Sequence, residues 1–432
     1  ADQKIQIDET FLQSLVATLP YQLTDGQRKA AWEIIKDLSS GQPMRRMLYG
    51  EVGSGKTIIA LLVAATVISA GKKVAMLVPT TTLAEQQARV AKEILGTQNI
   101  KVAMVTSERK ENHIDADLII GTQSILQKQL GLDSVALVIV DEQQRLGVND
   151  RQHLINENPT AHMLMMTATP IPRSLAHILF GQMALSYLRG RPAHQKPVGT
   201  IIFDEKNRAE IESKIEERVR RGEPGYVICP LIESNDDEIV EDLLATERKA
   251  VAKEAKRLND RFPNFKIALM HGRLKGDEKT KILNKFRRNE IDILVSTTVV
   301  EVGIDNPNAT WILVEEADCF GLATLHQLRG RVGRGEKESV CFLAKRGSIT
   351  DLGVQRLNAV VATNDGLELA EADLKLRGPG ELTGVEQSGL PKLRYANWQD
   401  LDLVKEMFER SEKIVQDGVE KYPAIVRAMK IF

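Results

Sequence analysis

The sequence predicts an α/β protein with two tandem, doubly wound parallel-sheet domains, followed by a C-terminal module that contains a helical hairpin and a loop. Two observations lead to this prediction. Short apolar runs alternate with longer amphipathic stretches, as in parallel βαβ units. The runs also fall into two sets, separated by a segment rich in Arg, Gly and Pro at Arg189–Gly199, which is typical of a linker. We expect the two domains to face each other across a cleft.

Each half of the chain contributes five expected strands. Those of the first half are Met47–Tyr49, Val74–Val78, Leu118–Ile120, Val135–Val140 and Met163–Met166. Those of the second half are Tyr226–Cys229, Lys266–Met270, Ile291–Val295, Trp311–Val314 and Val340–Leu343. After the last run the pattern changes to two helical stretches, a loop rich in Gly and Pro, and a final helix from about Gln399. We therefore expect domains at residues 1–190, 191–348 and 349–432.

Composition describes an ordinary globular protein and restricts its partners. The 432 residues are 43% hydrophobic and 27% charged, with a formal net charge of -1. Any nucleic-acid contact must therefore come from a local basic surface. Three widely spaced cysteines, without metal-ligand spacing, fit a reducing compartment. Because no apolar run approaches the roughly 18 residues of a membrane span, we expect a cytoplasmic protein. We also expect a monomer.

A glycine-rich loop predicts a phosphate site. Residues 50–57 fit the pattern G-x-x-x-x-G-K-[ST], follow an expected strand and open an apolar helix. Backbone N–H groups of such a loop wrap a β-phosphate, and the helix N-terminus adds its positive end. Lys56 would neutralise phosphate charge and the Thr57 hydroxyl would bind Mg²⁺, which predicts ATP and Mg²⁺ as cofactors. The expected cofactor-binding residues here are Gly50, Glu51, Val52, Gly53, Ser54, Gly55, Lys56 and Thr57.

Two further elements would complete the nucleotide site. Asp141 and Glu142 follow the expected strand Val135–Val140, so they should lie where parallel sheets bind ligands. Asp141 suits Mg²⁺ and its waters, and Glu142 suits polarising the attacking water. Standing alone, this acid pair could also be a solvated turn. Gln27 could pair with an adenine edge, and Tyr21 could either stack on the base or serve packing.

Further motifs occur in order along both halves and resemble the motif set of superfamily 2 helicases. They are Pro79-Thr80, Gly121-Thr122-Gln123, Thr167-Ala168-Thr169-Pro170, His271-Gly272-Arg273, Ser296-Thr297-Thr298 with Gly303-Ile304-Asp305, and Gln327–Arg334. Within that superfamily the chain is similar to RecG, a family of bacterial branched-DNA helicases. This resemblance rests on residues 19–24, 167–173, 296–335, 363–366 and 376–382. It implies RecA-like domains, the first binding ATP.

The resemblance also implies roles for individual residues. Gln327, Arg331 and Arg334 would complete the catalytic site. An arginine finger stabilises the negative charge of the transition state and can raise the rate of hydrolysis by about 10³–10⁵. Interdomain salt bridges are the alternative for these arginines. Gly303 and Asp305 would contact the nucleotide. The threonines Thr80, Thr122, Thr297 and Thr298 would hold the DNA backbone, although each could instead cap a helix. The basic run His271–Glu290 could contact DNA or form a solvated helix face.

The module after residue 348 resembles the translocation motif shared by RecG and the transcription-repair coupling translocase. By position, Arg356 and Arg377 match its hairpin arginines and Gln387 its loop glutamine. Two departures stand out: Gln123 and Gln144 occupy positions where the family has histidine, so a titratable charge is lost there. Whether these substitutions change the coupling between the ATP site and the DNA site is left open.

The sequence thus predicts an ATP-dependent DNA helicase or translocase of RecG type, which couples ATP hydrolysis to movement on duplex or branched DNA, without sequence preference, in recombination and replication-fork repair. The alternatives are a coupling-translocase motor, an RNA helicase and a silent DNA clamp. The family's N-terminal wedge domain has no counterpart upstream of the motor, so this chain alone should unwind junctions inefficiently. Since it begins at Ala1, the chain is expected to be either a fragment or a naturally short relative.

Overall fold

The computed structural model describes most of the chain between residues 4 and 377 and part of the C-terminal region. The described residues are 4–107, 109, 111–126, 135–142, 160–169, 183–188, 196–230, 240–271, 274, 276–297, 306–347, 349–377, 403, 406–407, 410–411, 413–414 and 417–429. The chain divides into two compact units, one formed by residues 1–170 and 184–376 and the other by 171–183 and 377–432. Residues 349–376 belong to the first of these units, and the predicted domain bounds stay a prediction.

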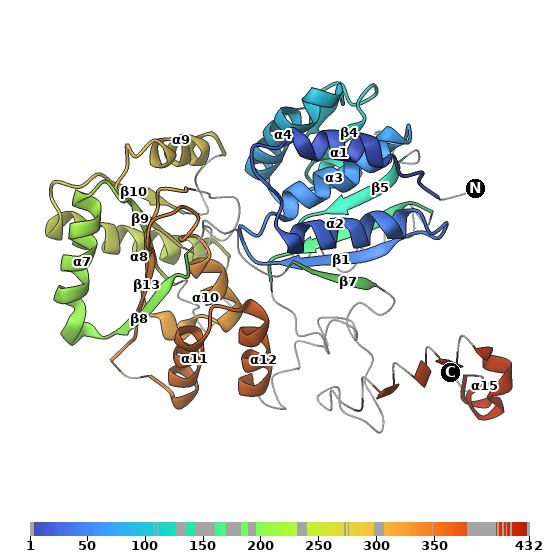
Figure 1. Ribbon diagram of the computed structural model, residues 1–432. Helices are drawn as coiled ribbons and strands as arrows, with labels where there is room; N and C mark the ends of the chain where they lie inside the picture. The colour runs from blue at the N-terminus through green and yellow to red at the C-terminus, as the bar shows by residue number, and fades with distance from the viewer. Residues whose placement is uncertain are drawn as a thin grey trace. The chain divides into compact units, whose positions relative to one another are not determined.

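A seven-stranded, fully parallel sheet forms the first domain (Figure 1). The strand order is β3-β4-β2-β5-β6-β1-β7. The strands are β1 (Arg45–Gly50), β2 (Lys73–Leu77), β3 (Val102–Val105), β4 (Leu118–Gly121), β5 (Val135–Val140), β6 (His162–Thr167) and β7 (Ala184–Leu188). Because β5, β6 and β1 are neighbours, the segments that follow them meet at one edge of the sheet. These segments are the acid pair, Thr167–Thr169 and the glycine-rich loop.

The helices of this domain are α1 (Glu9–Ala17), α2 (Asp25–Leu38), α3 (Lys56–Ser69) and α4 (Thr81–Leu95), with short 3₁₀ turns at Gly96–Gln98 and Gln123–Leu126. Apolar residues occupy every side of α3, and it is buried from Ile58 to Val67. The helices α1, α2 and α4 all contact it. The helix that follows the glycine-rich loop is therefore held firmly, and so is the loop at its N-terminus.

The second domain is a six-stranded parallel sheet with the order β10-β11-β9-β12-β13-β8. Its strands are β8 (Gly199–Phe203), β9 (Gly225–Ile228), β10 (Ile267–Met270), β11 (Ile293–Ser296), β12 (Trp311–Val314) and β13 (Val340–Ala344). Alternate residues of one strand belong to different cores: Ile312 and Val314 lie in one, and Trp311 and Leu313 in the other. The sheet is thus covered on both faces, as expected for parallel strands.

The remaining described helices of this unit are α7 (Arg208–Arg220), α8 (Val240–Arg261), α9 (Gly276–Arg287), α10 (Leu322–Arg329), α11 (Asp351–Ala362) and α12 (Gly366–Arg377), with 3₁₀ turns at Glu205–Asn207 and Ala317–Cys319. The last two helices form the predicted hairpin. Leu357, Val360 and Leu369 of the hairpin belong to a core cluster of the second domain. The hairpin therefore packs as part of that domain. In the C-terminal unit the described elements are a 3₁₀ turn at Val419–Lys421 and α15 (Pro423–Met429).

The ten predicted strands are all present, and the α/β fold class is confirmed. The prediction missed β3, β7 and β8, and it assigned Gly199 to a linker although this residue begins β8. All three missed strands lie at sheet edges. Two of them lack the continuous buried apolar run of a central strand, since Ile201 of β8 is 38% exposed and Ser186 interrupts β7. The third, β3, is an apolar run, Val102–Val105, that the prediction overlooked.

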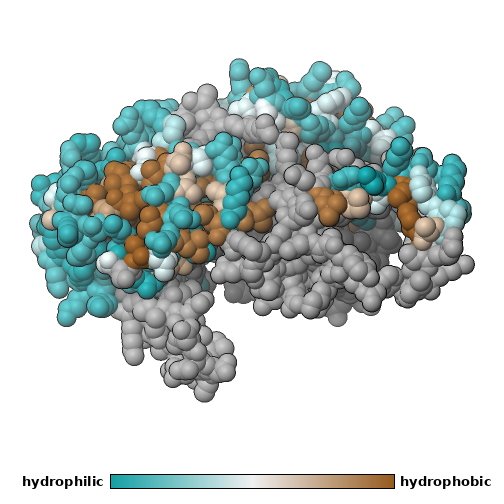
Figure 2. All heavy atoms as spheres, turned by 90° about the horizontal axis from the view of Figure 1, so that it is seen from below, coloured by the Kyte–Doolittle hydropathy of each residue, from teal (hydrophilic) through white to brown (hydrophobic). Residues whose placement is uncertain are grey.

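Hydrophilic side chains cover much of the described surface, with apolar patches between them (Figure 2). The large apolar side chains that remain exposed include Ile201 of β8 and Val354 and Val361 of α11. The helix α11 contacts β8, so these residues come from neighbouring elements. Among the described helices, none has both the length and the apolar character that a bilayer-spanning segment needs.

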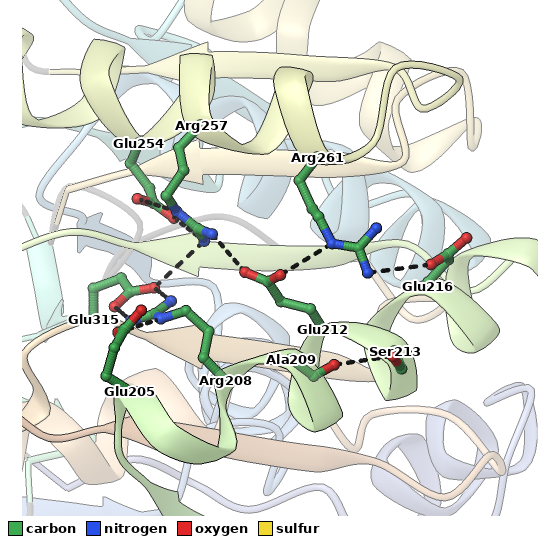
Figure 3. Close-up of polar contacts among 10 residues, drawn as sticks. All are labelled: Glu205, Arg208, Ala209, Glu212, Ser213, Glu216, Glu254, Arg257, Arg261 and Glu315. Carbon is green, nitrogen blue, oxygen red and sulfur yellow. Dashed lines mark hydrogen bonds and ion pairs between the residues drawn. The ribbon is translucent and has the colours of Figure 1, made fainter.

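An ionic network fastens α7 and α8 to the end of β12 (Figure 3). Arg208 donates to both carboxylate oxygens of Glu315, at 2.7 and 2.8 Å. The buried carboxylate of Glu212 accepts from Arg257 and, at 3.2 Å, from Arg261. Such bidentate and charge-assisted bonds order the helices that cover this face of the second sheet.

Replacing Glu212 should therefore destabilise the second domain. We expect Glu212→Ala to lower the free energy of unfolding by about 1.5 kcal/mol, because Arg257 and Arg261 each lose a charge-assisted bond to a buried carboxylate but keep Glu254 and Glu216 as partners. Urea unfolding of both variants and the wild type measures the effect. The control is Glu217→Ala on the same helix, whose exposed pair with Arg221 should contribute about 0.5 kcal/mol or less. Equal losses in the two variants would contradict a stabilising role for the network.

Candidate nucleotide-binding site

The glycine-rich loop joins β1 to α3, as predicted. Gly55 has φ +90°, a conformation that side chains rarely adopt, and directly precedes the first residue of α3. A Cβ atom at Gly55 would lie 2.3 Å from Nε2 of Gln27, and one at Gly50 would lie 2.5 Å from Oγ of Ser54. The loop can take this compact shape only because both positions are glycine.

The side-chain amide of Gln27 links the glycine-rich loop to the start of α2. Its Nε2 donates to the carbonyl of Ser54 at 2.9 Å, and its Oε1 accepts from the backbone N–H of Thr24 at 2.9 Å. The Thr24 hydroxyl accepts from the Gln27 backbone in return, which completes a capping box at the start of α2. Nε2 and Oε1 of Gln27 can each form one more hydrogen bond. A contact between Gln27 and adenine stays a prediction. Tyr21 is 51% exposed.

Lys56 is the buried cation of the site. Its Nζ donates to the carbonyls of Gly50, at 2.6 Å, and Glu51, at 3.1 Å, so the side chain folds back across the loop. Burial lowers the pKa of Lys56, while the carboxylates of Glu142 and Asp141 act in the opposite direction. An ammonium whose hydrogen-bond partners among the described residues are loop carbonyls is well placed to exchange them for phosphate oxygens.

The acid pair stands at the end of β5. Burial raises the pKa of Asp141 to about 7, the charge of Glu142 adds to this, and Lys56 opposes it. The Asp141 Oδ1 accepts from the backbone N–H of Glu142 at 3.0 Å. Glu142 has φ +48°, the left-handed region that favours glycine, so its backbone is strained. Both acids line a cavity of about 640 Å³ together with Thr122 and Gln123.

The donor set fits a magnesium ion that is held mainly by a nucleotide. Mg²⁺ usually keeps several waters and is bound through one or two carboxylates and substrate phosphates. Asp141 would supply the carboxylate and Thr57 the hydroxyl, which now accepts from Nε2 of Gln87 at 3.1 Å. No group of three His, Cys, Asp or Glu side chains suitable for a metal occurs in the described residues, so an all-protein metal cage is not built there.

The second domain brings its own polar residues to the first. Nε2 of Gln327, on α10, donates to the hydroxyl of Thr169, just after β6, at 2.8 Å. Arg331 is buried, and Arg334 donates from Nε to the carbonyl of Gly330 at 3.1 Å. Both arginine charges act on Lys56 and lower its pKa, which places them within its electrostatic range. Residues from both domains thus gather at the loop.

Sequence reasoning missed Arg329, which is almost fully buried. Its guanidinium donates to the carbonyls of Val360, at 2.6 Å, and Thr363, at 2.9 Å, and lies 3.1 Å from Nδ1 of His326. A guanidinium can only donate, so Nδ1 of His326 is the acceptor. The carbonyls belong to the end of α11 and the turn after it, where a helix leaves carbonyls without partners. The sequence carries no signal that this helix end meets α10.

The predicted DNA residues lie in mixed environments. Thr80 caps α4, since its Oγ1 accepts from Leu83 N at 3.3 Å, and Thr297 is fully buried after β11. The Thr122 hydroxyl pairs with that of Ser124, and Arg356 lies on α11. Their contact with DNA stays a prediction. Outside the described residues lie Gln144, Thr298, Gly303, Asp305, Gln387 and the side chain of Arg377.

Comparison with known families defines the class of protein. The DEAD/DEAH box helicase family matches residues 24–178, and the helicase conserved C-terminal domain matches 225–336. The fold is also similar to that of the Mycobacterium smegmatis helicase Lhr, with 20% identity over 83% of this chain and 50% of Lhr, and a TM-score of 0.57. The chain therefore carries the two domains of a helicase.

A more specific match covers the C-terminal region. Residues 363–425 match the C-terminal part of domain 3 of the ATP-dependent DNA helicase RecG. RecG of Staphylococcus epidermidis is 39% identical over 97% of this chain and 62% of its own length, and RecG of Aquifex aeolicus is 41% identical over 91% and 50%. A RecG structure bound to a three-way DNA junction aligns with 35% identity and a TM-score of 0.74, over 93% of this chain and 53% of that one.

Along almost its whole length the chain is similar to RecG-type ATP-dependent DNA helicases, and it spans about 62% of the length of the staphylococcal relatives. The resemblance inferred from the sequence motifs is thereby confirmed.

The buried carboxyl group of Asp141 predicts a pH-dependent stability. Its pKa of about 7 lies above the usual 3.8, so the folded chain holds a proton that the unfolded chain loses, and stability falls as pH rises from about 4 to about 7. Asp141→Asn carries no charge and avoids this loss. Its advantage in free energy of unfolding over the wild type should grow by about 1–2 kcal/mol between pH 5.5 and pH 8.

Urea unfolding at the two pH values, without nucleotide or divalent cations, measures this difference. The control is Asp115→Asn, which changes an exposed aspartate of the same domain. An advantage of Asp141→Asn that stays constant across the range would show that the carboxyl group of Asp141 does not titrate there.

Proposed function

We propose that this chain is a motor that hydrolyses ATP between the glycine-rich loop of the first domain and the arginines of the second, and uses the energy to move on duplex or branched DNA. The observation that carries the proposal is that Lys56 lies within electrostatic range of Asp141 and Glu142 of its own domain and of Arg331 and Arg334 of the other. A site divided between two domains can change their relation when its ligand binds or is hydrolysed. We expect a cytoplasmic monomer.

Each residue has a distinct task in this proposal. The loop N–H groups and Lys56 bind the phosphates, and Mg²⁺, which supplies charge neutralisation when bound, is held by Thr57 and Asp141. Glu142 orients and polarises the attacking water. Arg331 and Arg334 stabilise the charge that develops in the transition state, and they do so only when the two domains are close. Gly303 and Asp305 would add contacts to the nucleotide.

DNA is the proposed partner because RecG, in the aligned structure, is bound to a three-way DNA junction. The helices α4 and α9 of the two domains line a cavity of about 400 Å³. Its lining has a net positive charge, with four cations, Arg89, Lys92, Arg109 and Arg287, against two acids, Glu85 and Glu111. Such a local basic surface is what a chain with a net charge of -1 needs to attract phosphates. Thr80, Thr122, Thr297 and Thr298 would fix the backbone without reading sequence.

The hairpin and the loop after it would convert the ATP cycle into movement on DNA. Arg356, Arg377 and Gln387 are the residues proposed for this step. The match of residues 363–425 to RecG domain 3 favours this reading over a coupling-translocase motor or an RNA helicase. The phosphate site has Lys56, Asp141 and Glu142 all in place, which favours an active motor over a silent clamp. Recombination and replication-fork repair are the processes in which such a motor would act.

The most informative test measures ATP hydrolysis by this chain with no polymer, with single-stranded DNA, duplex DNA, forked DNA and RNA. We expect duplex and forked DNA to stimulate turnover most, since the proposed partner is duplex or branched DNA. Stimulation by RNA alone would favour an RNA helicase, and binding of DNA without any turnover would favour a clamp. Either result would overturn the proposal.

Two substitutions should separate ATP binding from turnover. Lys56→Ala should abolish turnover and weaken nucleotide binding at least about tenfold, because it removes the charge that phosphates meet. Glu142→Gln should also abolish turnover but change nucleotide affinity less than about threefold, because the amide keeps the shape and loses only the charge that polarises water. A fluorescent nucleotide reports affinity, and phosphate release reports turnover. Equal loss of affinity in both variants would contradict this division of tasks.

A further inference from the structure

The glycine-rich loop contacts the hairpin directly. Oε1 of Glu51 accepts a hydrogen bond from the backbone N–H of Gly366 at 3.2 Å. Gly366 is the first residue of α12, so Glu51 binds one of the N–H groups that a helix start leaves without a partner. A carboxylate is also favoured there by the positive end of the helix dipole. Glu51 therefore joins two segments 315 residues apart in the chain.

The approach at this point is too close for any side chain on Gly366. A Cβ atom there would lie 2.6 Å from the hydroxyl of Tyr49 and 2.7 Å from Nε2 of His326. Tyr49 is the residue before the glycine-rich loop, and His326 lies on α10. The hydroxyl of Tyr49 is buried, and no hydrogen-bond partner for it occurs among the described residues. The start of α12 is thus seated against the strand that carries the loop.

Arg329 holds the same turn from its other side. It donates to the carbonyls of Val360 and Thr363, which end α11 and begin the turn, and it pairs with His326. The turn between the hairpin helices is therefore bound both by α10, which carries Gln327, and by the glycine-rich loop through Glu51.

We propose that Glu51 is a positioning residue, which reports the occupancy of the glycine-rich loop to the hairpin through its bond to Gly366. This inference rests on the proposed function, because it takes a nucleotide as the ligand of the loop. It differs from that function in assigning the side chain of Glu51 to the hairpin and in predicting a direct route from the loop to α12.

The present contacts explain how occupancy would be transmitted. The carbonyl of Glu51 now accepts from Nζ of Lys56 at 3.1 Å, while its carboxylate accepts from Gly366. Phosphates that enter the loop compete for Lys56, so the Glu51 peptide loses a partner. Their negative charge also repels the Glu51 carboxylate. Both effects weaken the bond to Gly366 when the loop is filled. By linkage, a change in the hairpin must alter nucleotide affinity by the same factor.

Hydrogen exchange of the backbone amides in residues 363–369 tests this route. Each protein is compared with and without ADP or a non-hydrolysable ATP analogue, at equal occupancy as measured with a fluorescent nucleotide. In the wild type, nucleotide should accelerate exchange in this segment at least about threefold, because opening frees the amide of Gly366. Glu51→Gln keeps an acceptor oxygen and serves as the conservative variant, so part of the acceleration should remain.

Glu51→Ala removes the acceptor, and Gly366→Ala introduces the clash with Tyr49 and His326. In both variants the segment should exchange rapidly even without nucleotide, and nucleotide should change the rate less than about 1.5-fold. The control is Gly347→Ala, where an added Cβ meets nothing within 4 Å, and it should behave as the wild type.

Three outcomes would overturn the inference in distinguishable ways. Nucleotide bound to the wild type without any change in exchange at 363–369 would overturn the route and leave the proposed function standing. A full nucleotide response in Glu51→Ala would show that Glu51 does not carry the signal. A wild type that binds no nucleotide would overturn the proposed function together with this inference.

Discussion

The buried ammonium group of Lys56 is the constraint on which the rest of the site depends. A charge removed from water must be compensated, and here the carbonyls of Gly50 and Glu51 and the nearby carboxylates do so. This compensation requires that β1 and β5 end at the same edge of one parallel sheet. Burial and the charge of Glu142 nevertheless raise the pKa of Asp141, because the nearby Lys56 offsets them only in part. The site is thus arranged to receive a ligand that brings negative charge.

The second domain is joined to this site by residues whose main partners are backbone atoms or hydroxyl groups. Gln327 contacts Thr169, and Arg329 donates hydrogen bonds to carbonyls of the hairpin. One short helix, α10, therefore connects the phosphate region with the start of α12. Because α11 and α12 share the core of the second domain, movement of that domain must carry the hairpin with it. The start of α12 is thus linked to the glycine-rich loop through packed elements.

Much of this arrangement could be predicted from the sequence. The ten predicted strands, the loop at residues 50–57 and the acid pair follow from local patterns, since each depends on residues close together in the chain. The edge strands β7 and β8 were missed because partly buried strands lack continuous buried apolar runs, whereas β3 was overlooked although Val102–Val105 is apolar. Glu51 was assigned to the phosphate only, and His326 and Arg329 received no separate role, because their partners lie in the hairpin. Such long-range contacts depend on how helices pack, which local patterns do not encode.

A crystal structure of the chain with a non-hydrolysable ATP analogue and Mg²⁺ tests the central claim most directly. The distance from Nζ of Lys56 to the carbonyl of Gly50, now 2.6 Å, reports which partner the ammonium chooses. The account predicts that Lys56 leaves the carbonyls of Gly50 and Glu51 and contacts phosphate oxygens, with Asp141 near the metal. An analogue bound elsewhere, with Lys56 still on those carbonyls, would contradict it.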